Sequence, residues 1–271
     1  MSSITETQLD DWQQAVGREQ VAEEVLAASA LQRFGRAVGC RDELDGVPLP
    51  HWAFFLPSPL DEEIGSDGHP RRGDFLPDVT LPRRMYAASS IEFVSDLEIG
   101  APARQVSTVA DLTHKSGSTG DLVFAKVEKR LEQEGSLRVR EVQTYVYRGE
   151  GEPAPMPVPA DVTPEGERWQ PDEVNLFRFS AATANGHRIH YDHPYTTQVE
   201  GYPALIVHGP FTAAKLAALA MRDGALASFS FRAMAPLFVG QPITLRRSDE
   251  NTYEAVRCDG LIAMSAKASF R

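Results

Sequence analysis

Apolar residues return at helical spacing in two stretches of the chain. Over residues 6–38 they stand three to five positions apart with acidic residues between them, which predicts one amphipathic helix ended by Gly39. Residues 209–222 are rich in alanine and carry Pro210 in what would be the first turn, and both features favour a second helix.

Other stretches are rich in β-branched and aromatic residues that alternate with polar ones, and these predict strands. The first half is expected to form strands at 91–94, 103–112, 122–131 and 137–147, and the second half at 174–179, 227–233, 242–248, 253–256 and 261–270. Glycine and serine between the strands at 115–120, and Glu134-Gly135, have the composition of turns.

Proline marks two segments that cannot be regular helix or central strand. Residues 46–84 mix seven prolines with strongly apolar patches, which indicates an ordered loop on a surface rather than a linker. Residues 149–170 are poor in such patches and predict an extended linker. We therefore expect an N-terminal domain at 1–148 and a C-terminal domain at 171–271.

A short internal repeat supports two related halves. Leucine, glycine and proline coincide at Leu97 and Leu237, Gly100 and Gly240, and Pro102 and Pro242, with a constant offset of 140 residues. The pattern suggests two copies of one unit, each about half of the chain.

Composition narrows the classes of partner. The net charge of −11 without a large basic block makes nucleic acid and anionic membranes poor partners, and no apolar run is long enough to span a bilayer. Two distant cysteines and the absence of a signal-peptide pattern lead us to expect a cytoplasmic protein. A small anionic substrate stays open, because paired arginines can offset the global charge locally.

The densest chemistry lies at 179–195, where three histidines, His187, His190 and His193, fall within seven residues. Histidine titrates near neutral pH and therefore suits proton transfer. The spacing matches no common zinc pattern and no cysteine is near, so no metal is expected. Two non-catalytic roles stay open for these histidines: His187 and His193 could be solvated turn residues, and His190 could be a buried structural residue.

Residues 183–192 resemble the motif of MaoC-type hydratases, also called hydratase 2, which reads roughly S-G-D-x-N-P-L-H-x-D before an apolar segment that ends in His-Gly. His190 falls on the motif histidine and Asp192 on its last acid, and 205–209 falls on the His-Gly segment. Asn185 stands where the family has aspartate, and His187 where it has asparagine. Residues 68–85 are similar to a subgroup that includes 3-methylfumaryl-CoA (mesaconyl-C4-CoA) and itaconyl-CoA hydratases and mitochondrial-type hydroxyacyl-thioester dehydratases.

The resemblance implies an α+β double hot dog, in which two long helices are each wrapped by an antiparallel sheet and the two sheets are continuous. It places a buried helix near 190–199, limited by Gly201 and Pro203. The first half would keep the fold without the motif, and its loop at 46–84 would help to cover an acyl-CoA tunnel.

The same resemblance assigns roles. His190 is the expected acid and base, Asn185 orients water, and backbone N–H groups near His208 and Gly209 hold the thioester oxygen. Candidate substrate-binding residues, including those that could pair with a second carboxylate, are Arg188, His187, Arg84 and Arg83.

The implied activity is hydration of a short branched dicarboxylic enoyl-CoA, itaconyl-CoA or 3-methylfumaryl-CoA, to give citramalyl-CoA. No cofactor is expected beyond the coenzyme A of the substrate, and a homodimer stays open. Three alternatives remain at this point: a dehydratase of longer hydroxyacyl thioesters, a thioesterase that uses Asp192, and a non-catalytic acyl-CoA binding protein.

Overall fold

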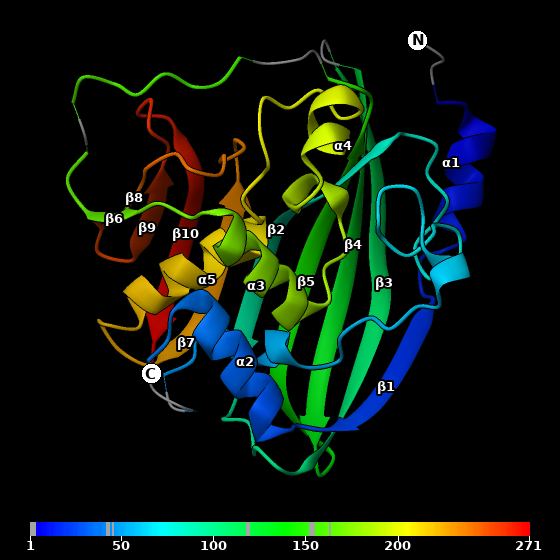
Figure 1. The fold of residues 1–271 in the computed structure, drawn as a ribbon. Helices are drawn as coiled ribbons and strands as arrows, with labels where there is room; N and C mark the ends of the chain where they lie inside the picture. The colour runs from blue at the N-terminus through cyan, green and yellow to red at the C-terminus, as the bar shows by residue number, and fades with distance from the viewer. Residues whose placement is uncertain (1–3, 42–43, 45, 118–119, 152–154, 163) are drawn as a thin grey trace.

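A single antiparallel sheet dominates the computed structural model (Figure 1). The structure describes residues 4–41, 44, 46–117, 120–151, 155–162 and 164–271. Within them the sheet has ten strands in the order β1-β3-β4-β5-β2-β7-β10-β9-β8-β6. The strands are β1 (Glu19–Val25), β2 (Arg83–Phe93), β3 (Pro102–Gly117), β4 (Gly120–Gln133), β5 (Ser136–Arg148), β6 (Glu167–Trp169), β7 (Leu226–Ala233), β8 (Ile243–Asp249), β9 (Thr252–Val256) and β10 (Ile262–Phe270).

From either edge of the sheet, the strands of one half follow in the same order: its first, third, fourth, fifth and second strand along the chain. This order confirms the internal repeat. Each half contributes five strands in one arrangement, and the halves join where β2 pairs with β7. Ser90 lies opposite Ser230 at the centre of that pairing, an offset equal to the one found in the sequence. Gly100 and Gly240 both have positive φ, 93° and 75°, a conformation that glycine adopts without strain.

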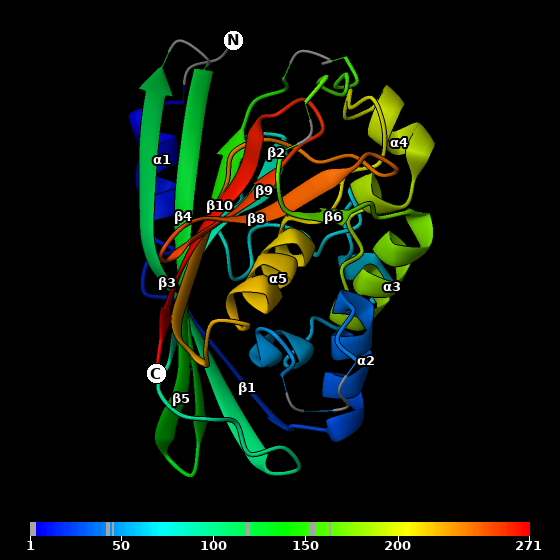
Figure 2. The same cartoon turned by 90° about the vertical axis from the view of Figure 1, so that its left-hand side faces the viewer.

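The helices are α1 (Glu6–Gln13), α2 (Ala28–Val38), α3 (Glu173–Thr183), α4 (His193–Gln198) and α5 (Gly209–Ala220), with short 3₁₀ turns η1 (Pro50–Ala53), η2 (Asp61–Glu63) and η3 (Arg188–His190). Figure 2 shows α5 between the sheet and an outer layer that holds α2 and α3. The α5 helix confirms the helix predicted at 209–222, and it is buried because its inward positions are small or apolar.

The single helix predicted over 6–38 is wrong. Gly17 has a φ of 89° and donates its N–H to Val109, and β1 then pairs with β3 at the edge of the sheet. Val21 and Val25 are 48% and 53% exposed. Because this edge strand buries no regular face, two valines four positions apart imitate the spacing of a helix.

The strand predicted at 174–179 is also wrong, because these residues belong to α3. Asp172 and Asn175 form a capping box, in which each side chain bonds the backbone of the other. Leu176 and Phe179 are buried one turn apart on the inner face. The Asp172–Asn175 pair was the sequence signal that could have predicted a helix start here, and its effect outweighs the β-propensity of residues 174–179.

The buried helix expected near 190–199 is replaced by the six-residue α4, whose N-cap is Asp192 and which buries only Tyr195 and Thr196. Glycine and proline at 201–203 stop it early, so the central position is taken by α5 instead.

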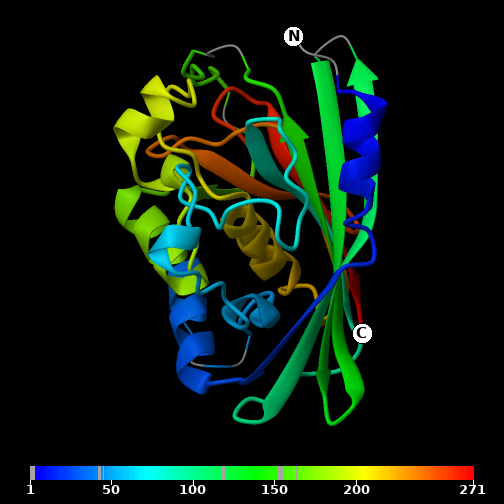
Figure 3. The ribbon, with the colours of Figure 1, turned by 90° about the vertical axis from the view of Figure 1, so that its right-hand side faces the viewer.

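The proline-rich segment before β2 is ordered, as expected. Arg72 donates to the carbonyls of Val79, Leu81 and Pro82 and thereby closes the segment on itself. Figure 3 shows it, in cyan, between the outer helices and the strands of the first half. Its last two residues, Arg83 and Arg84, already belong to β2.

Residues 149–170 join the two halves, and of those that the structure describes only the three of β6 form regular secondary structure. The division into separate domains stays a prediction. None of the described helices has the length and apolar character needed to cross a membrane.

Candidate active site

The histidine motif follows the end of α3. Ala184 takes a left-handed conformation with φ of 48° and ends the helix. The side-chain oxygen of Asn185 then accepts the backbone N–H of His187 at 3.0 Å, a local turn that leaves the amide NH₂ of Asn185 to face other groups. The chain enters η3, which presents His190.

His190 is held in one tautomer. Its Nδ1 lies 2.7 Å from the carbonyl oxygen of Ile206, and because a carbonyl only accepts, Nδ1 carries the proton. The side chain is 7% exposed, yet Nε2 bonds no described residue and is not among the polar atoms that are sealed without a partner. Nε2 therefore keeps its lone pair and remains reachable.

Four imidazoles from three segments form a continuous column, which we call the histidine column. The ring of His69 lies 4.4 Å from that of His187, His187 lies 5.6 Å from His190, and His190 stacks on His208 at 3.6 Å. At the far end, Nε2 of His208 lies 2.9 Å from the hydroxyl of Ser180. His69 was not predicted because it lies far before the motif in the sequence. Ser180 was not predicted because it lies just before residue 183, where the motif begins.

The histidine column is uncharged near neutral pH. Burial lowers the pKa of His69, of His187 and of His190 to about 3, and burial lowers that of His208 as well. Arg84 lowers the pKa of His69 and of His187 further. Two stacked imidazoles in a buried site cannot both be protonated cheaply. His190 is consequently available as a neutral base.

The N-terminus of α5 lies beside the histidine column, since His208 is its N-cap and Gly209 its first residue. Pro210 has no N–H, so Gly209 and Phe211 carry the donors of the first turn. In the described part of the chain no acceptor is bonded to the Gly209 N–H. Free N–H groups at a helix N-terminus attract a developing negative charge.

The loop that carries His69 is docked against the motif backbone to backbone. The N–H of Arg188 donates to Asp67 at 2.9 Å, and Arg188 Nη1 donates to the carbonyl of Ser66 at 3.0 Å. A Cβ built on Gly68 would lie 2.0 Å from the carbonyl oxygen of Gly186. Only glycine fits there, and this close approach brings His69 onto His187.

Two of the three candidate arginines are already paired. Nε and Nη2 of Arg188 both donate to Asp192, at 2.9 and 2.6 Å, and the guanidinium lies over the ring of Tyr195. Arg83 lies 3.3 Å from the carboxylate of Glu200 and over Tyr202. These contacts argue against the predicted role of Arg188 and Arg83 in reading a substrate carboxylate.

Arg84 differs from both. It makes no ion pair with any carboxylate among the described residues. Arg84 lies on β2 opposite Tyr147 of β5. Its charge contributes to lowering the pKa of His69 and of His187 and opposes the rise in the pKa of Tyr145 caused by burial. Arg84 is thus a cation without a carboxylate partner among the described residues, and its charge acts on two members of the histidine column.

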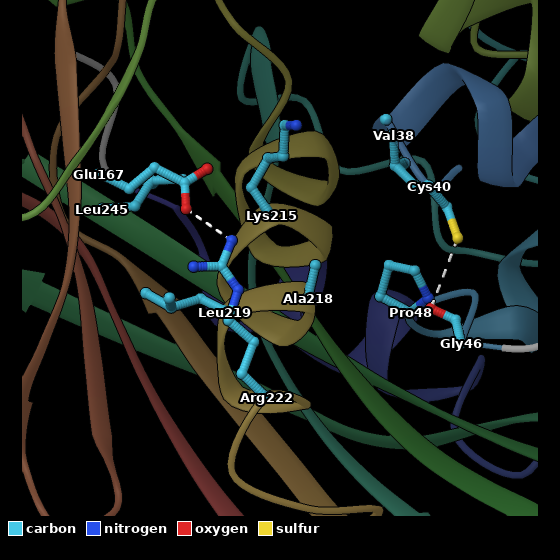
Figure 4. Close-up of a pocket in the computed structure, with 11 residues that line it drawn as sticks. Val38, Cys40, Gly46, Pro48, Glu167, Lys215, Ala218, Leu219, Arg222 and Leu245 are labelled. Carbon is cyan, nitrogen blue, oxygen red and sulfur yellow. Dashed lines mark hydrogen bonds and ion pairs between the residues drawn. The ribbon is translucent and has the colours of Figure 1, made fainter. Parts of the chain in front are cut away.

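A cavity of about 180 Å³ lies elsewhere, at the C-terminal part of α5 (Figure 4). Lys215 lines it, and Arg222 is paired with Glu167 at 2.6 Å. It shares no lining residue with the histidine column and holds none of the predicted site residues.

Comparison with known proteins agrees with this geometry. Residues 49–239 match the family model described as hydroxyacyl-thioester dehydratase type 2. The chain is 40% identical over 274 residues to the mesaconyl-C(4)-CoA hydratase of Chloroflexus aurantiacus, covering 94% of this chain and 96% of that protein.

Two solved structures show the fold. HtdX from Mycobacterium tuberculosis superposes with a TM-score of 0.68 at 15% identity, covering 93% of this chain and 99% of that one. Another protein of that organism, described as a double hot dog, has a TM-score of 0.56 at 12% identity and covers 93% and 95%. The expected α+β double hot dog is confirmed as a fold, but the expected pair of long central helices is not: in the described part of the first half the proline-rich segment before β2 takes the place that α5 has in the second half.

Proposed function

This chain belongs to the hydroxyacyl-thioester dehydratase type 2 family, and from that premise we propose that it hydrates mesaconyl-C4-CoA to citramalyl-CoA. It is an enzyme of the carbon–oxygen lyase class that acts on enoyl thioesters. The proposed substrate carries a methyl group and a free carboxylate on the β-carbon of the double bond. The observation that carries the choice of a dicarboxylic substrate is the charge of Arg84, which pairs with no described carboxylate and contributes to lowering the pKa of His187.

His190 acts as the base and then as the acid. Its Nε2 takes a proton from water while the water oxygen bonds to the β-carbon, and the electrons of the double bond move toward the thioester oxygen. The imidazolium then returns that proton to the α-carbon, so that one water is added in total. The bond from Nδ1 to the Ile206 carbonyl keeps the ring in place and stabilises the transient cation.

Asn185 would position the water. Its Oδ1 already bonds the His187 backbone, so the NH₂ group is the part left to donate to the water oxygen. An amide cannot ionise, which leaves the proton transfer to the imidazole.

The thioester oxygen is assigned to the start of α5. The Gly209 N–H and the helix dipole would stabilise the enolate-like oxygen, a contribution of about 3 kcal/mol for one well-placed donor. Gly209 has no side chain to block the approach, and the carbonyl of Tyr86 lies 3.7 Å from where a Cβ would stand.

Arg84 would bind the free carboxylate, with His187 and His69 beside it. The proposal predicts that this arginine matters only for substrates that have a second carboxylate. It also accounts for an arginine that keeps no carboxylate partner in the described part of a strongly acidic chain.

The thioesterase alternative is weaker, because Asp192 is the N-cap of α4 and pairs with Arg188, and both contacts lower its pKa. That carboxylate is occupied and is not free to activate water. The longer-chain dehydratase and the non-catalytic binder are separated from the proposal by experiment. A cytoplasmic location and a homodimer stay predictions.

The experiment follows the conjugated absorbance of mesaconyl-C4-CoA with purified protein and analyses the products by mass spectrometry. Hydration predicts loss of absorbance, a product heavier by one water and no free thiol. Release of thiol would instead show a thioesterase, and binding without turnover would show a carrier.

The dicarboxylate assignment is tested with Arg84→Ala, and with Arg188→Ala as the matched control. Arg84→Ala should lower kcat/KM for mesaconyl-C4-CoA by about 10- to 100-fold, since a charge-assisted hydrogen bond contributes about 1.5–3 kcal/mol, and leave that for crotonyl-CoA nearly unchanged. Equal losses on both substrates would contradict the assignment.

A further inference from the structure

A buried carboxylate in the first half is surrounded by donors that the hydration mechanism does not use. Glu141 on β5 is 1% exposed. It accepts hydrogen bonds from the hydroxyls of Tyr86 and Ser89, both at 2.7 Å, and from the indole N–H of Trp52 at 3.2 Å. Nε2 of His51 lies 3.3 Å from its other oxygen.

This carboxylate is charged in spite of its burial. Burial alone would raise the pKa of Glu141, but the contact with His51, the charges of His51 and Lys129 and the bond from Ser89 hold it down to about 2. Removing an ion from water is expensive unless several donors replace the water. Apolar side chains could fill the same volume at a lower cost in desolvation free energy. What the charged carboxylate provides in addition is directed hydrogen bonds from Trp52 and Tyr86.

The cluster does not form a second catalytic centre. In the repeat, η1 with His51 follows α2 as η3 with His190 follows α3. The two histidines differ in their surroundings, because both ring nitrogens of His51 are sealed from solvent whereas Nε2 of His190 is not. The first half has therefore kept the histidine but closed it off against Glu141.

The rings that Glu141 holds lie next to the proposed site. Trp52 and Tyr86 each meet Phe231 edge to face, at 6.1 and 5.6 Å, and Tyr86 stacks on Tyr145 at 5.5 Å. The backbone of Tyr86 contacts Gly209 at the start of α5. Tyr145 lies close enough to Arg84 for the arginine to influence its pKa.

Three of these rings keep part of their surface accessible although protein surrounds them. Trp52, Tyr86 and Tyr145 are half-buried, while burial raises the pKa of both tyrosines above the ordinary range. The rings connect the two proposed binding positions. The Tyr86 carbonyl lies near Gly209, the Tyr86 ring stacks on Tyr145, and the charge of Arg84 acts on the pKa of Tyr145.

We propose that Trp52 and Tyr86 are specificity-determining residues that form the inner wall of the acyl site, and that Glu141 is the positioning residue that holds them, so that only short acyl groups fit. The inference rests on the proposed function and adds a limit on chain length to it. It makes Glu141 important for which substrate is accepted rather than for the chemical step.

The test compares kcat/KM for trans-2-octenoyl-CoA with kcat/KM for crotonyl-CoA in each variant, so that differences in the amount of folded enzyme cancel in the ratio. Trp52→Ala should raise the octenoyl-to-crotonyl ratio about tenfold or more, within the range that a hydrophobic pocket discriminates. Tyr86→Phe removes one anchoring bond, and Glu141→Gln keeps one carbonyl acceptor but removes the charge that strengthens the bonds. Both keep the shapes of the side chains, and they should raise the ratio by a smaller factor. Thermal unfolding is recorded for every variant.

Tyr253→Phe is the matched control. The Tyr253 hydroxyl also donates to a carboxylate, that of Asp223, but it lies away from the histidine column, on β9 in the second half. Its substitution should leave the ratio unchanged. If Trp52→Ala does not fold, Tyr86→Phe carries the test, because it deletes one oxygen and keeps the ring.

The outcomes separate the two proposals. A wild-type enzyme with equal kcat/KM for octenoyl-CoA and crotonyl-CoA would contradict the proposed acyl-site wall and leave the hydratase assignment unaffected. Folded Trp52→Ala and Tyr86→Phe variants with an unchanged ratio would do the same. A wild-type enzyme that hydrates no enoyl thioester would overturn the proposed function and this inference with it.

Discussion

At the scale of single residues, the chemistry of His190 depends on what surrounds it. The Ile206 carbonyl selects the tautomer, and burial with the neighbouring His187 keeps the ring neutral. Asp192, which stands on an acid of the family motif, serves instead as a helix cap and as the partner of Arg188. The same residue types can thus be catalytic or structural, and only their contacts distinguish them.

His190→Ala should reduce turnover of mesaconyl-C4-CoA by at least about 100-fold, because it removes the group that moves the proton. His193→Ala is the control, since His193 belongs to the same motif but is exposed on α4. Steady-state rates, with circular dichroism to verify folding, decide the matter. A folded His190→Ala enzyme with near-normal turnover would remove His190 from the mechanism.

At the scale of elements, the site exists because a loop from the first half docks on a turn of the second half. Gly68 and Gly186 meet backbone to backbone, and His69 reaches His187 as a result. The motif alone supplies His187, His190 and Asn185, while the loop supplies the fourth imidazole and covers the motif.

Gly68→Ala should displace this loop and lower kcat/KM by more than its effect on stability accounts for. Its new Cβ would collide with the Gly186 carbonyl, which is backbone and cannot move aside cheaply. Gly73→Ala is the matched control, because Gly73 lies in the same loop with positive φ, 106°, but its nearest contact is an ordinary 3.5 Å. Both should lose about 1 kcal/mol from the strained conformation. Equal activity in the two variants would show that the docking is dispensable.

At the scale of the whole molecule, the two halves have diverged in how they use one arrangement of strands. The second half keeps a central helix and an accessible histidine, and the first half replaces them with a proline-rich loop and a sealed His51–Glu141 contact. A repeat of this kind produces one site per chain, built where the halves meet.

The histidine column should make the whole protein sensitive to mild acid. The pKa values of His69, His187 and His190 are about 3 in the folded state and about 6.5 in the unfolded state. Below pH 6.5 the unfolded chain binds protons that the folded chain does not, so stability falls as the pH is lowered from 6.5 toward 3. Each histidine contributes up to about 1.4 kcal/mol per pH unit.

Urea unfolding at pH values between 7.5 and 5 measures this slope. The carboxylate of Glu141 adds to the loss only below about pH 4.5, its ordinary range, so the histidines dominate above that value. His187→Gln removes one titrating group, so it should reduce the slope of the unfolding free energy against pH by up to about 1.4 kcal/mol per pH unit. A free energy of unfolding that does not change between pH 7 and 5 would contradict the assignment.

The alternation of apolar and polar residues predicted eight of the ten strands in the described part of the chain, β2 to β5 and β7 to β10. It missed the edge strands β1 and β6 and added a strand at 174–179, where the chain forms α3. Central strands pack on both neighbours and carry a regular inner face, so their pattern is strong. The short or exposed edge strands bury little and leave no pattern. The motif at 183–192 pointed to Asn185 and His190, and the separate segment at 205–209 pointed to Gly209, because each is a short continuous stretch of sequence. The catalytic roles of these residues stay a proposal.

By itself, the sequence determined the repeat of two halves, the existence of a helix near 209–220 and the family to which the motif belongs, because each of these is written in local spacing. Only the tertiary structure decided that Arg84, unlike Arg83 and Arg188, has no carboxylate partner among the described residues, that α5 takes the central position, that His69 completes the histidine column, and that Glu141 bonds Trp52 and Tyr86. Charge pairing and ring stacking join residues that are distant along the chain, and burial then sets the charge of each group.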